Sequence, residues 1–135
     1  MLEKYPTGVK LVHKNFPIRS HKFAFKAAIA ALAADRQGKF WEFHDELYKN
    51  YNRLTDQKIE AIAKQLQLNE TEFKAYQKNP EIAAQIQRDY EEGIRLGIRG
   101  VPTVFINGKK IRDRSLKGFE EIINRELEKA KVAQE

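Results

Sequence analysis

The chain has 135 residues, and its 25 lysine and arginine side chains exceed its 19 aspartate and glutamate side chains, giving a formal net charge of +6 at pH 7. Hydrophobic residues make up 41% and charged residues 33%, a composition typical of one folded domain with a core. No stretch approaches the roughly 18 apolar residues of a membrane-spanning helix. The lack of cysteine excludes disulfides, thiolate metal sites and cysteine nucleophiles within these residues.

Basic side chains cluster at residues 10–22 and 109–117. Such clusters attract nucleic acid or acidic membrane surfaces, because neutralisation of phosphate drives that binding. No signature of a nucleic-acid module accompanies them, and no aromatic residue interrupts the later cluster. We therefore expect a solvated basic surface and no nucleic-acid partner.

The first expected element is a half-buried strand at residues 9–16, where Val9 and Leu11 alternate with polar positions. An alanine-rich helix is expected from about residue 20 to 37, and its small side chains permit close packing. A second helix is expected at residues 39–50.

Four further helices carry recognisable start signals. Thr55, Asn69 and Ser115 have side chains that cap helix N-termini, and Pro80 suits the first turn of a helix. The four helices are expected at residues 56–66, 70–79 and 80–96, and from 115 onward.

Residues 100–108 predict a hairpin between the last two helices. The turn is Asn107-Gly108, because both positions tolerate the positive φ of a tight two-residue turn. We expect its strands near residues 103–107 and 109–112. Pro102 begins the first strand; an X-Pro bond is usually trans, whereas a cis bond would turn the preceding backbone outward.

No metal site or catalytic constellation follows from residue spacing. His44, Asp45 and Glu46 are consecutive, and side chains one or two residues apart on a helix point in different directions. We expect His44 to be a packed histidine and Trp41 to be a core residue. No glycine pattern has the strand-then-helix context of a phosphate loop. The expectation is therefore no metal and no cofactor.

Three segments, in the right order, resemble DsbA-like thiol-disulfide oxidoreductases of the thioredoxin superfamily. Residues 9–18 resemble the strand after the active-site helix, residues 38–48 the helical insert, and residues 96–108 the cis-proline loop with its following strand. The resemblance implies an α/β (α+β) fold, helix-rich and incompletely thioredoxin-like, with the three predicted strands in a small sheet. It implies a single domain over residues 1–135 with a helical insert at about 20–96.

The resemblance also implies a substrate-binding loop of Gly100, Val101, Pro102 and Thr103. In such a loop Pro102 is cis, and the backbone of Val101 would pair with an extended substrate polypeptide. The family's Cys-x-x-Cys helix has no counterpart here, so no catalytic residue is assigned. We expect the C-terminal part of a longer oxidoreductase, inactive alone. The alternative is a naturally cysteine-free peptide-binding or chaperone-like module.

The residues themselves do not determine the cellular compartment. The N-terminus lacks the basic start, apolar middle and small-residue cleavage site of a secretory signal. The resemblance suggests the bacterial periplasm or cell envelope, where DsbA-like enzymes usually work.

The resembled fold would place its first strand between residues 9–16 and 103–107. Without that strand two edges are unpaired, and unpaired edges recruit other strands. We predict that the chain forms a homo-oligomer or closes the gap by pairing the two remaining elements. Sedimentation velocity over a dilution series measures this. A stable monomer with dispersed amide signals and no exposed apolar patch would contradict association.

Overall fold

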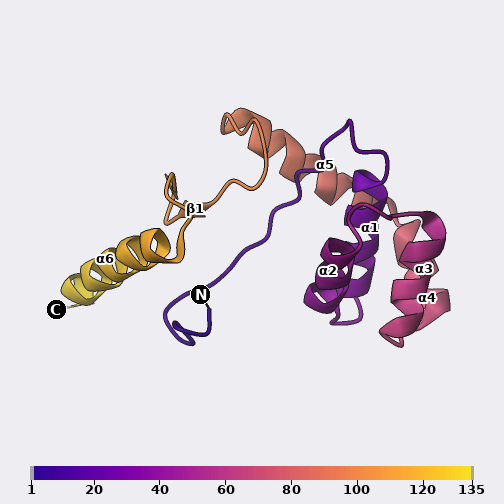
Figure 1. Cartoon of the computed structure of the whole chain (residues 1–135), viewed down its shortest axis with the longest axis horizontal. Helices are drawn as coiled ribbons and strands as arrows, with labels where there is room; N and C mark the ends of the chain where they lie inside the picture. The colour runs from indigo at the N-terminus through magenta and orange to yellow at the C-terminus, as the bar shows by residue number, and fades with distance from the viewer. Residues whose placement is uncertain (1, 135) are drawn as a thin grey trace. The chain divides into compact units, whose positions relative to one another are not determined.

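The computed structural model describes residues 2–134, in which six helices and one short hairpin are found (Figure 1). The chain divides into two compact units. Residues 14–97 form the first, which we call the helical unit. The described residues before 14 and after 97 form the second, which we call the hairpin unit.

The helical unit contains every helix that the sequence predicts between residues 20 and 96. The first helix is shorter than expected, since residues 20–23 form turns in which the amides of His21 and Ala24 bond to carbonyls three residues earlier. The bounds are α1 Ala24–Asp35, α2 Phe40–Lys49, α3 Asp56–Gln65, α4 Glu70–Gln77 and α5 Pro80–Arg95.

The predicted helix start signals in this unit are confirmed. The side-chain oxygens of Thr55 and Asn69 each accept a bond of 3.0 Å from a backbone N–H in the first turn of α3 and α4. Pro80 occupies the first turn of α5, and Asn79 caps that helix with a bond of 2.9 Å. These bonds satisfy amides that have no partner within the helix.

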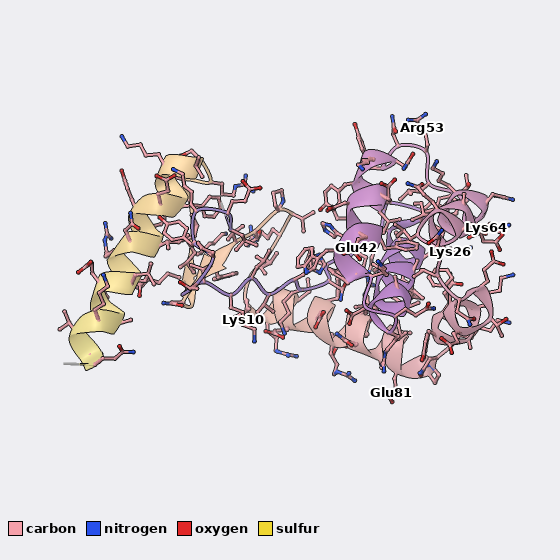
Figure 2. The ribbon with its side chains drawn as sticks, turned by 90° about the horizontal axis from the view of Figure 1, so that it is seen from below. Lys10, Lys26, Glu42, Arg53, Lys64 and Glu81 are labelled. Carbon is pink, nitrogen blue, oxygen red and sulfur yellow. The ribbon has the colours of Figure 1, made fainter. Side chains whose placement is uncertain are left out.

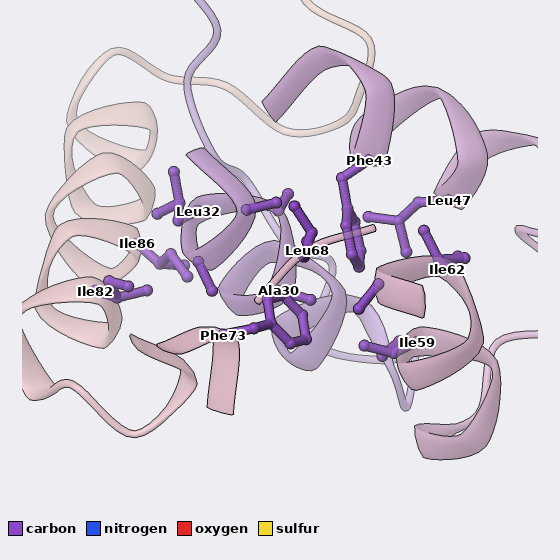
Figure 3. Packing of buried hydrophobic residues seen from close by; sticks show 14 residues of the cluster. Ala30, Leu32, Phe43, Leu47, Ile59, Ile62, Leu68, Phe73, Ile82 and Ile86 are labelled. Carbon is purple, nitrogen blue, oxygen red and sulfur yellow. The ribbon is translucent and has the colours of Figure 1, made fainter. Parts of the chain in front are cut away.

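Helix α1 is the centre of the helical unit, because it contacts α2, α3, α4 and α5. Its buried face consists largely of alanine, whose small side chains let the neighbouring helices approach closely. Figure 3 shows the larger side chains converging on this face from the surrounding helices. The rings of Phe43 and Phe73 stack with centroids 5.6 Å apart. The fully buried larger side chains are Phe43, Ile62, Ile82 and Ile86.

Charged side chains cover the outside of this core. Figure 2 labels Lys64 and Glu81, which are exposed on α3 and α5. Lys26 reaches from α1 to Asp56 at the start of α3, with its Nζ 3.1 Å from a carboxylate oxygen. Exposed pairs of this kind contribute little to stability, so burial against α1 is the main stabilising term of the unit.

The predicted strand at residues 9–16 is wrong, since this segment contains no strand. Leu11 and Val12 are 48% and 59% exposed, so the apolar alternation does not bury one face. At the end of the segment the backbone N–H of Asn15 donates to the Asp89 carboxylate at 3.0 Å. A strand requires a neighbouring backbone to accept its amides, and here a side chain on α5 takes that role.

The hairpin unit contains β1 Phe105–Ile106, β2 Lys109–Lys110 and α6 Leu116–Gln134. The strands pair antiparallel, with Ile106 opposite Lys109. The turn residues Asn107 and Gly108 have φ of 48° and 81°, which confirms the predicted turn. Both strands are shorter than predicted, and they are the only strands of the sheet among the described residues.

Residues 2–8 of the hairpin unit lie along α6. The Tyr5 hydroxyl donates to the Asn124 side chain at 2.9 Å, and Lys4 pairs with Glu120. A Cβ on Gly8 would lie 3.2 Å from a methyl group of Leu127. These contacts tie the start of the described chain to its last helix, and the whole is an α+β arrangement.

We predict that Ile86→Ala lowers the free energy of unfolding by about 2–5 kcal/mol, because it leaves a cavity beside α1. Ile86 is fully buried on α5. Ile94 lies on the same helix but is 53% exposed, so Ile94→Ala should cost at most about 0.5 kcal/mol. Urea unfolding of both variants measures the difference. Equal losses would contradict this account of the core.

Candidate functional site

The candidate site is the loop that precedes β1, formed by residues 100–103 and called the Val101 loop below. Gly100, Val101 and Pro102 are exposed, and Thr103 is half-buried. The Thr103 hydroxyl donates to the Gly100 carbonyl at 2.7 Å and closes the loop on itself. The Val101–Pro102 peptide bond is cis. Closed by the Thr103 hydrogen bond, the loop presents a short stretch of backbone directly before the hairpin.

Val101 combines an exposed side chain with unused backbone groups. It is 49% exposed. Within the part of the chain that the structure describes, its N–H and C=O make no hydrogen bond. Backbone groups of this kind beside a strand are the chemical requirement for adding an extended peptide.

Arg114 lies against the same loop and was not found by the sequence analysis. Its guanidinium Nη1 donates to the Pro102 carbonyl oxygen. Arg114 belongs to the connection between β2 and α6, residues 111–115, so it approaches the loop from a segment that follows it in the chain. No sequence signal distinguishes Arg114 from the neighbouring basic residues, because only tertiary proximity selects it.

The connection that carries Arg114 is held in place by hydrogen bonds at the start of α6. A carboxylate oxygen of Asp113 accepts from the Ser115 N–H at 3.0 Å, and the Ser115 hydroxyl accepts from the Gly118 N–H at 3.1 Å. Hydrogen bonds from Ser115 lower the pKa of the Asp113 carboxyl. The predicted capping role of Ser115 is thus confirmed.

Gly118 permits the close approach of this connection to α6. A Cβ at that position would lie 2.4 Å from the Asp113 carbonyl oxygen, closer than any real contact. The glycine is therefore required by packing, because its φ is not in the left-handed region.

Glu126 on α6 anchors the other end of the hairpin. Its carboxylate accepts from the Asn107 amide at 3.3 Å and from the Lys109 ammonium at 3.2 Å. These contacts, first from Asn107 and then from Lys109, lower the pKa of the Glu126 carboxyl. Glu126 thereby connects the turn of the hairpin to the helix behind it.

His44 and Trp41, which the sequence predicts to be packed, lie in the helical unit. His44 is half-buried, with the rings of Trp41 and Tyr48 at centroid distances of 5.4 and 4.6 Å. The prediction that Trp41 is a core residue is wrong, since it is 43% exposed. Phe43 and Leu47 occupy the buried face of α2, and Trp41 projects from its flank.

Other site classes receive no support from the described residues. Among residues 2–134, no group of three or more histidine and acidic side chains is placed to hold a metal ion. None of the helices found there is long and apolar enough to cross a membrane. The chain also contains no cysteine.

Comparison with known proteins identifies the family. A family model described as thioredoxin matches residues 1–125. The probable disulfide bond formation protein D of Bacillus anthracis is 27% identical over 132 residues, covering 90% of this chain and 59% of that protein. The chain belongs to the thioredoxin superfamily and is a DsbA-like member of it.

A second group of relatives shares a smaller segment. The Na⁺/H⁺ antiporter NhaA 3 of Salinispora tropica is 32% identical over 105 residues, covering 77% of this chain but 16% of the antiporter. The chain thus spans about three fifths of the disulfide bond formation relatives and less than a fifth of the antiporters. No solved structure matches the chain.

The lowered pKa of Glu126 predicts how stability depends on pH. Because the folded state lowers that pKa, the contribution of Glu126 is complete above the ordinary range of a glutamate carboxyl and is lost as the pH falls through the lowered value. We expect Glu126→Gln to reduce the acid-induced fall in the urea midpoint between neutral pH and about pH 3. Glu128→Gln, on the exposed side of α6, is the control. Identical pH profiles for wild type and Glu126→Gln would contradict the assignment.

Proposed function

We propose that this chain provides the substrate-docking part of a DsbA-like thiol-disulfide oxidoreductase. In this proposal the backbone of Val101 pairs with an extended polypeptide, and Gly100, Pro102 and Thr103 shape the loop that receives it. The observation that carries the proposal is the exposed Val101 backbone, which makes no hydrogen bond among the described residues and lies directly before β1.

The proposed division of chemistry follows from the lack of cysteine. Disulfide exchange requires a thiolate that attacks a disulfide sulfur and forms a mixed disulfide, while a thiolate leaves. This chain has no cysteine, so it performs neither step. The cysteine pair would lie outside these 135 residues, and the Val101 loop would hold the polypeptide through main-chain hydrogen bonds.

The proposed domain organisation assigns each unit a part. The hairpin unit would be the thioredoxin-like portion that carries the docking loop. The helical unit, residues 14–97, would contain the helical insert, at about residues 20–96, of a single domain. The antiporter relatives do not extend the proposal to ion transport, because the shared segment is only 16% of their length.

A naturally cysteine-free peptide-binding or chaperone-like module is the second candidate function. It is favoured by the complete lack of cysteine in 135 residues. The gene discriminates between the two candidates. An in-frame strand and Cys-x-x-Cys helix within about 20 codons before codon 1 would support the oxidoreductase, since that helix needs only a few turns. An in-frame stop codon with a ribosome-binding site there would support the cysteine-free module.

The proposal predicts that the isolated 135-residue chain has no redox activity. We expect no turnover in the reduction of insulin disulfides or in the oxidation of a dithiol peptide, because no group in the chain forms a mixed disulfide. The uncatalysed rate in buffer is the baseline. Turnover above that baseline, proportional to the concentration of cysteine-free protein, would contradict the proposal.

Peptide binding tests the proposed docking function of the Val101 loop. We expect an extended peptide to shift the amide signals of the Val101 loop, and Val101→Pro to weaken binding at least about tenfold, because proline lacks the N–H that pairs with the peptide. Val101→Ala is the matched control, since it keeps both backbone groups, and its affinity should stay within about threefold of wild type. Equal binding by the proline and alanine variants would rule out docking through this backbone.

A further inference from the structure

We infer that Arg114 makes the Val101 loop selective for polypeptides that carry an acidic side chain next to the docked segment. This inference rests on the proposed function, because it requires that the loop holds a peptide. It adds the class of polypeptide and the residue that selects it.

Arg114 is held against the Val101 loop by a hydrogen bond. Its Nη1 donates to the carbonyl of Pro102, the residue that follows Val101. A guanidinium has five N–H donors in a rigid fork, so one bond to the loop leaves others available to a ligand. Arg114 is exposed. A fixed positive charge therefore lies beside the backbone that would receive the peptide.

Asp113, the acidic residue next to Arg114 in the sequence, does not pair with it. Its carboxylate is directed toward Ser115 at the start of α6, and the carbonyl of the same residue packs on Gly118. Among the described residues Arg114 makes no ion pair. The Asp113 carboxylate is thus engaged at the start of α6, and the positive charge of Arg114 stays beside the loop.

The segment around Arg114 carries an excess of positive charge. Residues 109–117 contain five basic side chains and one acidic side chain. Of the basic ones, Lys109 is paired with Glu126 at 3.2 Å. The excess positive charge favours an anionic partner, and arginine binds carboxylates with two parallel hydrogen bonds. A glutamate or aspartate side chain on the docked peptide is anionic and accepts both of these hydrogen bonds.

A peptide is favoured over nucleic acid because of what lies next to Arg114. The unused N–H and C=O of Val101 match the main chain of an extended polypeptide, whereas a phosphate backbone offers acceptors but no donor for the Val101 carbonyl. Phosphate binding by the basic segment alone would not require the loop. Binding of nucleic acid in place of a peptide is therefore the competing outcome of the test.

The test uses two extended peptides that differ only by glutamate or glutamine at one position beside the docked residue. We expect the wild-type chain to bind the glutamate peptide about three- to tenfold more tightly at low salt, and the preference to shrink as salt screens the charges. Arg114→Gln should bind both peptides equally. Arg125→Gln, which removes the same charge from an exposed position on α6, should keep the preference.

The outcomes separate the two proposals. Failure of both peptides to bind wild type would overturn the docking function itself. Equal affinity of wild type for the glutamate and glutamine peptides, or an equal loss of preference in Arg114→Gln and Arg125→Gln, would overturn only the selectivity. Tighter binding of a short single-stranded oligonucleotide than of the glutamate peptide, lost in Arg114→Gln, would overturn it in favour of a nucleic-acid surface. Amide spectra of each variant establish that it is folded.

Discussion

The close packing of four helices on the alanine face of α1 is the constraint on which the helical unit depends. Methyl side chains at Ala30, Ala33 and Ala34 are fully buried, so the neighbouring helices supply the bulk of the core through Phe43, Ile86 and similar residues. A larger side chain on α1 would separate the neighbouring helices, and a smaller one on those helices would leave a cavity. This arrangement accounts for a stable unit that contains no sheet.

The hairpin unit depends on polar contacts and close backbone approach more than on a large core. Glu126 holds the turn of the hairpin through Asn107 and Lys109, while Gly118 lets the β2–α6 connection lie against the helix. In the same unit the Val101 loop is closed by Thr103 and contacted by Arg114. The loop is therefore held both by its own Thr103 and by Arg114 from the segment that precedes α6.

Family membership and the lack of cysteine together define what this chain contributes. Its relatives include proteins named for disulfide bond formation, yet no residue here performs thiol chemistry. Recognition of a polypeptide and exchange of its disulfide are separate physical tasks, since the first uses backbone hydrogen bonds and charge and the second uses a thiolate. In our proposal the charge of Arg114 adds selectivity to the first task and leaves the second unchanged.

The sequence by itself determined the helices, because helix propensity, as in the alanine-rich segment, and capping residues such as Thr55 and Asn69 act over a few neighbouring positions. It also determined the Asn107-Gly108 turn, for the same local reason. Only the tertiary structure decided that residues 9–16 form no strand and that Trp41 lies outside the core, since both depend on which neighbours are available. It likewise selected Arg114 among the basic residues, because the bond to Pro102 joins segments that no local pattern connects.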